Sequence, residues 1–296
     1  MKQYFYSLVI LLISFSAVKA QKTITLADDS VKLGSRYFPG FWLSIPEIKP
    51  DALKASWIKA IEKGTKSKVR IENNEMTIFG AIIPDICDGS MNIVSKTIDY
   101  DSLTQLFVSV ETTRDNFITR NSSEFDNLSK FLKKFGKDQY IKVAKDQLSA
   151  EEAKLSSLEK DLKSTRKNLL KYEKGIQSSN VRISQQNDKI KSADKELEIQ
   201  QIKIENATTL LSTLSDEKAR KAKQSELKDL QKKKKNLLKN INSAESSISK
   251  ANISIQDYKK NIELHGATQK ELGDKIIEQK QSIAWFQQKL KTIEAY

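Results

Sequence analysis

The residues of this chain best suited to a charge-based contact form a basic cluster between positions 218 and 239. Ten lysines and arginines fall there, against two acids, Glu226 and Asp229. Such a density favours contact with an anionic partner, either lipid headgroups, surface phosphates or an acidic protein of the cell envelope. The alternative is a solvated helix face that keeps a long rod in solution. The residues that we expect to bind the partner are Arg220, Lys221, Lys223, Lys228, Lys232, Lys233 and Lys235.

The positive charge is unevenly distributed along the chain. Residues 138–215 carry 14 basic and 12 acidic side chains, whereas residues 216–296 carry 18 and 11. Nucleic acid is not the expected partner, because no aromatic side chains lie among the lysines of the cluster to stack on bases.

Side chains for catalysis or metal binding are scarce. The chain has one histidine, His265, and one cysteine, Cys87. This excludes His-based metal sites, Ser–His triads and Cys–His pairs. Asp99 and Asp101 could act as an acid–base pair, but two acids flanking a tyrosine are typical of a hairpin turn. Since no glycine-rich phosphate loop is present either, we expect neither an enzyme nor a cofactor.

Three single residues allow both a structural and a functional interpretation. His265 falls opposite Leu169 in a helical seam, where it would either fix the register or titrate. Cys87 is either a small buried hydrophobic residue or half of an intermolecular disulfide. Trp285, together with Tyr296, is expected to pack against the N-terminal domain, with ligand recognition as the alternative.

The elements that position these residues are two long helices. From Ile141 to Leu211 every seventh residue is Leu or Ile. A second, softer row, which mixes apolar with small and polar residues, lies three positions further on. This spacing predicts a coiled coil. A second seam of the same kind runs from Leu227 to Leu290, and its register differs from that of the first. We therefore expect a turn at Ser215–Glu217 and an antiparallel hairpin with two arms of similar length.

The facing layers of this hairpin can be matched residue by residue. One pairing sets Ile183 against Ala251 and Ile190 against Ala244, so that large residues meet small ones. It also places Lys234 opposite Gln200, polar against polar. Glycines weaken helices. Kinked arms, or arms that fold back into a shorter bundle, are therefore alternatives to the extended hairpin. The glycines concerned are Gly175, Gly266 and Gly273.

The segment before the coiled coil predicts a small α+β domain. A strand at 41–45 is followed by a helix that starts at Pro50. Two hairpins then span 69–83 and 92–110, and a last helix at 125–135 is expected to end at Gly136. This order suggests a four- or five-stranded antiparallel sheet covered by two helices. Two alternatives concern the boundary that follows: a last strand at 140–143, or a later helix start at the capping box of Ser149.

The N-terminus predicts export. Lys2, an apolar run at 8–15 and the small residues Val18 and Ala20 fit a signal peptide that is cleaved after Ala20. A membrane anchor is the alternative, but the apolar run is short for a span, and no later segment could cross a membrane. We thus expect a periplasmic or secreted protein that is mostly α overall. The expected division is a signal peptide at 1–20, an α+β domain at 21–137, coiled-coil arms at 138–214 and 218–296, and a turn at 215–217.

In general plan, and not through a motif, the chain resembles exported proteins with coiled-coil hairpins. Periplasmic Skp-type chaperones share the signal peptide, the basic charge and the helical arms, and periplasmic efflux adaptors share the hairpin. The leading hypothesis is a non-enzymatic scaffold or adaptor of the cell envelope, and the second is a holdase chaperone. A membrane-active protein ranks third because the arms lack a long apolar stretch. The sequence does not decide whether the chain forms a homo-oligomer through the softer row of the seam.

Overall fold

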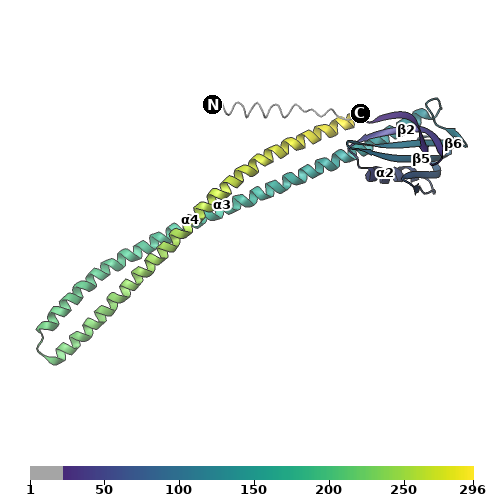
Figure 1. Cartoon of the computed structure of the whole chain (residues 1–296). Coiled ribbons are helices and arrows are strands. Elements are labelled where there is room, and N and C mark those ends of the chain that lie inside the picture. The colour runs from purple at the N-terminus through teal and green to yellow at the C-terminus, as the bar shows by residue number, and fades with distance from the viewer. Residues whose placement is uncertain (1–22) are drawn as a thin grey trace, which may run out of the picture. The chain divides into compact units, whose positions relative to one another are not determined.

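The computed structural model describes residues 23–296, so the predicted signal peptide at 1–20 lies outside the described residues. The chain divides into two compact units. The head unit comprises the described residues up to Lys154 together with Gln279–Tyr296, and the hairpin unit is Leu155–Glu278. Figure 1 shows a sheet and two long helices that run side by side. The α+β class of the N-terminal part and its order before a helical hairpin are thereby confirmed.

The head unit is built on one antiparallel sheet. Its spatial order is β1-β2-β6-β5-β4-β3, and β7 pairs with β6. The sequence predicted four or five of these strands and missed two short or polar ones at the edges. The strands are β1 (Thr25–Leu33), β2 (Arg36–Pro46), β3 (Arg70–Glu72), β4 (Glu75–Ile82), β5 (Ser90–Tyr100), β6 (Leu103–Thr113) and β7 (Asn116–Phe117).

Two helices cover one face of the sheet. Helix α2 (Pro50–Glu62) begins at a proline, whose fixed φ suits the first turn. It buries Trp57 against the first turns of α3 (Phe125–Thr213), with the Phe135 ring at 5.1 Å from the Trp57 ring. The indole Nε1 donates to Ser95 Oγ at 2.9 Å, so the largest core side chain also has its polar atom satisfied.

The predicted end of a helix at Gly136 is wrong. Helix α3 continues through this residue for 89 residues in all, and both alternatives at this boundary, a strand at 140–143 and a helix start at Ser149, are also wrong. Gly136 serves close packing instead. A Cβ added there would lie 3.2 Å from Ile24 Cγ2 and 3.3 Å from Leu43 Cδ1, tighter than ordinary contacts. Glycine therefore lets the helix approach the sheet.

The turn between the long helices lies where the sequence predicts it. Helix α4 (Glu217–Ala295) starts after a connection of three residues that ends at Asp216. The Asp216 carboxylate accepts the backbone N–H of Ala219 at 2.8 Å, and its carbonyl accepts that of Arg220 at 3.0 Å. Asp216 is thus the N-cap of α4, since it satisfies donors that have no partner within the helix.

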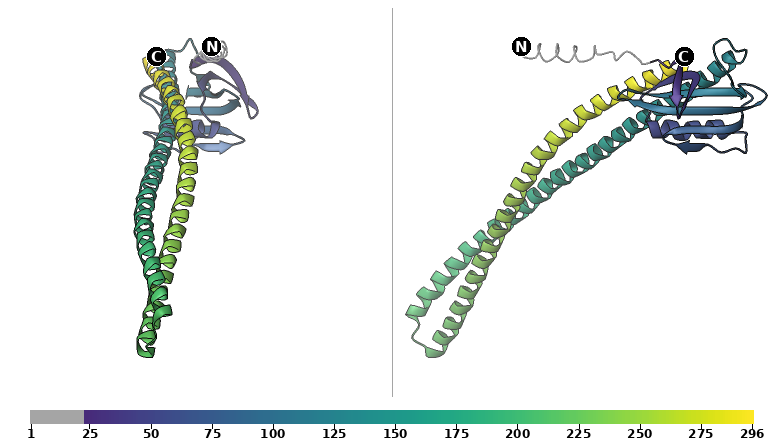
Figure 2. Two further views of the ribbon diagram at one scale, coloured as in Figure 1. Left: turned by 90° about the vertical axis from the view of Figure 1, so that its left-hand side faces the viewer. Right: turned by 45° about the vertical axis from the view of Figure 1, so that its right-hand side comes forward.

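Within the hairpin unit, α3 and α4 run antiparallel, as the two views of Figure 2 also show. The Tyr172 ring stacks on His265 at 5.5 Å and contacts the Tyr258 ring at 6.1 Å. Both helices pass through their glycines without a break, so the fold-back alternative is wrong. Gly175 makes room for Tyr258, whose ring would lie 2.7 Å from an added Cβ. The interlocking of side chains as a coiled coil stays a prediction.

Gly40 in β2 offers a test of the packing of the sheet. A Cβ at this position would lie 2.4 Å from the Val108 carbonyl oxygen and 2.8 Å from the Phe107 ring. We expect Gly40→Ala to lower the free energy of unfolding by about 1–3 kcal/mol, because neither neighbour can move freely. Guanidinium denaturation followed by tryptophan fluorescence measures it. Gly89→Ala is the control, because an added Cβ there meets nothing within 4 Å. Equal stability of the two variants would contradict the expected clash.

Candidate partner-binding surface of the helical hairpin

The seven basic residues singled out by the sequence all lie on the first part of α4, within the hairpin unit. Six of them are exposed, and Lys223 is half-buried. Two are paired with acids of the same helix: Lys221 Nζ lies 3.1 Å from Glu217 Oε1, and Lys223 Nζ lies 2.7 Å from Glu226 Oε2. Exposed ion pairs of this kind contribute little to stability.

The other five basic residues have no ion pair within residues 23–296. They are Arg220, Lys228, Lys232, Lys233 and Lys235. Lys234, which belongs to the same run, differs from them. It is half-buried and donates from Nζ to Gln201 Oε1 of α3 at 2.5 Å. The run therefore contains one lysine that links the two helices and several that offer unpaired charge to solvent.

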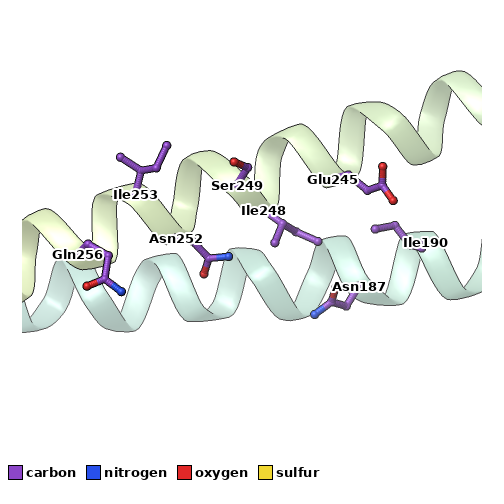
Figure 3. A pocket seen from close by; sticks show the side chains of 8 residues that line it. All are labelled: Asn187, Ile190, Glu245, Ile248, Ser249, Asn252, Ile253 and Gln256. Carbon is purple, nitrogen blue, oxygen red and sulfur yellow. The ribbon is translucent and has the colours of Figure 1, made fainter.

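A groove of about 560 Å³ lies between the helices further along the hairpin unit. In Figure 3, Ile248 and Asn252 point from α4 toward α3, whereas Ile253 points away. Ile190 and Asn187 of α3 complete the lining on the opposite side. Glu245 is the one titratable residue in the groove. Isoleucine side chains and amide groups together therefore form most of the lining.

One buried polar atom stands out between the helices. Gln200 is 5% exposed, and its Oε1 accepts no hydrogen bond from any residue in the described part of the chain. The sequence pairing placed Lys234 opposite Gln200, and the lysine instead bonds the neighbouring Gln201. A buried acceptor without a partner loses its hydration without compensation. This layer is consequently a weak point of the hairpin.

Replacing Gln200 should relieve this cost. We expect Gln200→Leu to raise the free energy of unfolding by about 1 kcal/mol, because it removes an unsatisfied acceptor and adds apolar contact. Thermal melting followed by circular dichroism at 222 nm measures the change. The matched control is Gln201→Leu, which removes the acceptor of Lys234 and should be neutral or destabilising. A Gln200→Leu protein that melts below the wild type would show that the amide makes a needed bond.

A polar centre that no sequence pattern indicated lies in the head unit. Lys289 of α4 is 8% exposed, and its ammonium group donates to the Glu47 carboxylate and to Gln147 Oε1. Glu47 lies just after β2 with φ of 60°, a strained value for a non-glycine residue. The ammonium also lies 5.5–5.7 Å from the centroids of three aromatic rings, those of Tyr140, Trp285 and Phe286.

Tyr140 of α3 belongs to the same centre. It is 1% exposed, and burial, with the nearby charges of Glu47 and Tyr296, raises the pKa of its hydroxyl to about 12. The ring is therefore neutral at physiological pH, and its face can attract the Lys289 ammonium. The polar centre thus ties α3, α4 and the chain after β2 together.

Trp285 and Tyr296, which were expected to pack against the N-terminal domain, do not enter its buried core, although the Trp285 ring lies beside Lys289. They are 49% and 60% exposed. Ile293, which is 0% exposed, is the residue of α4 that joins the core, and Leu290 packs against it in part. Both belong to the predicted seam rows, so the signal was present but was assigned to the hairpin.

The centre of Lys289 can be tested by removing each partner. We expect Lys289→Met and Glu47→Gln each to lower the free energy of unfolding by about 1–3 kcal/mol, because each removes one charge of an ion pair whose ammonium group is buried. The double variant should lose less than the sum of the two, since it leaves neither charge without a partner. Urea denaturation measures the cycle. Additive losses would mean that the two side chains do not interact.

The remaining singled-out residues are dispersed. His265 stacks on Tyr172 and so lies between the helices, as its seam position predicted. Cys87 is half-buried beside the head core. Asp99 and Asp101 are exposed at the β5–β6 turn. In the sequence they are more than a hundred positions before the basic cluster. Within residues 23–296, no group of His, Cys, Asp and Glu could hold a metal ion.

Over the same residues, none of the helices contains a stretch long and apolar enough to span a membrane.

Comparison with known proteins gives no relative: no family model matches the chain, and no curated protein matches it significantly. Its function must therefore be inferred from its own residues and their geometry.

Proposed function

We propose that this protein is an exported, non-enzymatic scaffold or adaptor of the cell envelope. In this proposal the α+β head and the coiled-coil hairpin hold partners in place, and the basic residues of α4 make one of the contacts. The observation that carries it is unpaired, exposed positive charge concentrated on one stretch of one helix. The residues concerned are Arg220, Lys228, Lys232, Lys233 and Lys235.

The charge pattern favours a contact over simple solvation. A helix that needs only to stay soluble does so with charges of mixed sign, as α3 does with nearly equal numbers of acids and bases after residue 138. A stretch of one sign creates a field that attracts an oppositely charged partner and speeds their encounter. We therefore propose an acidic surface of an envelope protein as the partner, bound in a salt-dependent way.

A holdase chaperone is the second candidate, and a different observation favours it. Several large apolar side chains of the hairpin unit are exposed, among them Leu264 at 62%, Ile253 at 60% and Leu170 at 58%. Scattered apolar residues of this kind, together with the groove of Figure 3, could contact unfolded segments without selecting a sequence. Such a protein would bind many clients, whereas an adaptor binds few.

Photo-crosslinking in cells distinguishes the two candidates. A photoreactive amino acid replaces Lys233 within the basic cluster, and a matched control replaces the exposed Lys260 on the same helix. We expect one or two discrete protein adducts from position 233 and none from position 260. Adding Lys232→Glu and Lys235→Glu should reduce the adducts at least about tenfold, because the attraction then becomes repulsion.

Other results would change the conclusion. A smear of unrelated proteins from both positions would support the chaperone. Lipid adducts from position 233 would mean that the partner is an anionic membrane surface and not an acidic protein. The absence of any adduct at position 233 would contradict a contact through the basic cluster.

A further inference from the structure

The open face of the head sheet holds a cavity of about 270 Å³ that plays no part in the proposed scaffold contact. Its floor is formed by Thr77 of β4, Val94 of β5 and Ser109 of β6, which lie in one row across the sheet. The volume lies just below the usual range for small-molecule sites, roughly 300–1,000 Å³. Any ligand of this cavity must therefore be small.

The turn between β1 and β2 forms one wall of the cavity. Two strands, β6 and β5, lie between β2 and β4 in the sheet. Nevertheless, the Gly34 N–H in this turn donates to Glu75 Oε1 of β4 at 3.4 Å, and Leu33 beside it is 3% exposed. The turn thus reaches across the open face and encloses the space beneath it. Gly34 has φ of 55°, a backbone conformation that suits glycine in such a tight turn.

Two carboxylates lie at opposite ends of the floor. Glu111 pairs with Asn92 across β6 and β5, whereas Glu75 pairs with Lys96, further along β5. The Glu111 carboxylate accepts Asn92 Nδ2 and the Asp115 N–H, each at 2.9 Å, and is held in place by both bonds. Within residues 23–296, neither glutamate forms an ion pair, and Lys96 does not line the cavity.

The one cation in the lining is already neutralised. Arg36 forms an ion pair with Asp115, and its guanidinium lies 5.5 Å from the Phe38 ring and 5.4 Å from the Phe117 ring. The cavity is thereby left with the negative charge of the two glutamates. Phe79 adds a further aromatic ring to the lining. Negative charge at two ends and apolar or aromatic surface between them complement a molecule with the opposite pattern.

We propose that this cavity binds a linear diamine, a short alkyl chain with an ammonium group at each end. Glu75 accepts hydrogen bonds from one ammonium group and Glu111 from the other. The alkyl chain lies over Val94 beneath Leu33. Charge-assisted hydrogen bonds of this kind are stronger than neutral ones, and both glutamates are half-buried, which reduces their screening by water.

Isothermal titration of the full mature chain tests the proposal. The probes are the unbranched diamines from three to six carbons, with the diols of the same lengths as neutral controls. We expect one diamine to bind with a stoichiometry of one, and no diol to bind. Glu75→Gln and Glu111→Gln, which keep the shape of the side chain, should each weaken binding at least about tenfold. The matched control is Glu72→Gln, which removes a carboxylate from the same β3–β4 hairpin outside the cavity and should leave binding unchanged.

A second measurement does not depend on the variants. Chemical shifts of the Val94 methyl groups and the Asn92 side-chain amide should change on addition of the diamine. Failure of every diamine to bind at millimolar concentration would overturn the proposal. Equal binding of the diols, or retained binding by both Glu→Gln variants, would do the same.

Discussion

The closure of the head core by a residue from the last turns of α4 is the constraint on which this structure depends. Ile293 is fully buried in the cluster formed by the sheet, α2 and the start of α3. One helical turn earlier, Lys289 bonds Glu47, which lies 242 positions away in the sequence. The apolar contact removes hydrophobic surface from water, and the polar contact pairs an ammonium group that would be costly to bury alone. Both long helices are therefore anchored at the same sheet.

Periodic features of the sequence predicted most of the fold. The two seam rows located both helices, and the register change located their turn, because a buried stripe repeats over many turns. Alternation of apolar residues located β4, β5 and β6 for the same reason. Strand β1 was missed because most of its residues are exposed, and its order comes from pairing with β2. Gly136 was misjudged because a glycine at a helix end and a glycine under a sheet look alike in sequence.

The sites were less predictable than the fold. The basic cluster could be found because its residues are neighbours in the chain, and their exposure agrees with its place on a helix surface. The centre of Lys289 and the cavity beneath the β1–β2 turn could not be found that way. Each joins residues from strands or helices far apart in the sequence, and a lysine next to a seam position, such as Lys289 beside Leu290, looks like a solvated one until its partners are known. Tertiary contacts of this kind leave no periodic signal.

The late position of Ile293 has a consequence for how the polypeptide is made. All seven strands are synthesised before either long helix is complete, but Ile293, which seals their core, lies in the last turn of α4. The nascent head therefore keeps part of its apolar surface uncovered until synthesis is almost finished, and its long-range contacts form last. Folding of such a chain is therefore completed only late in its synthesis.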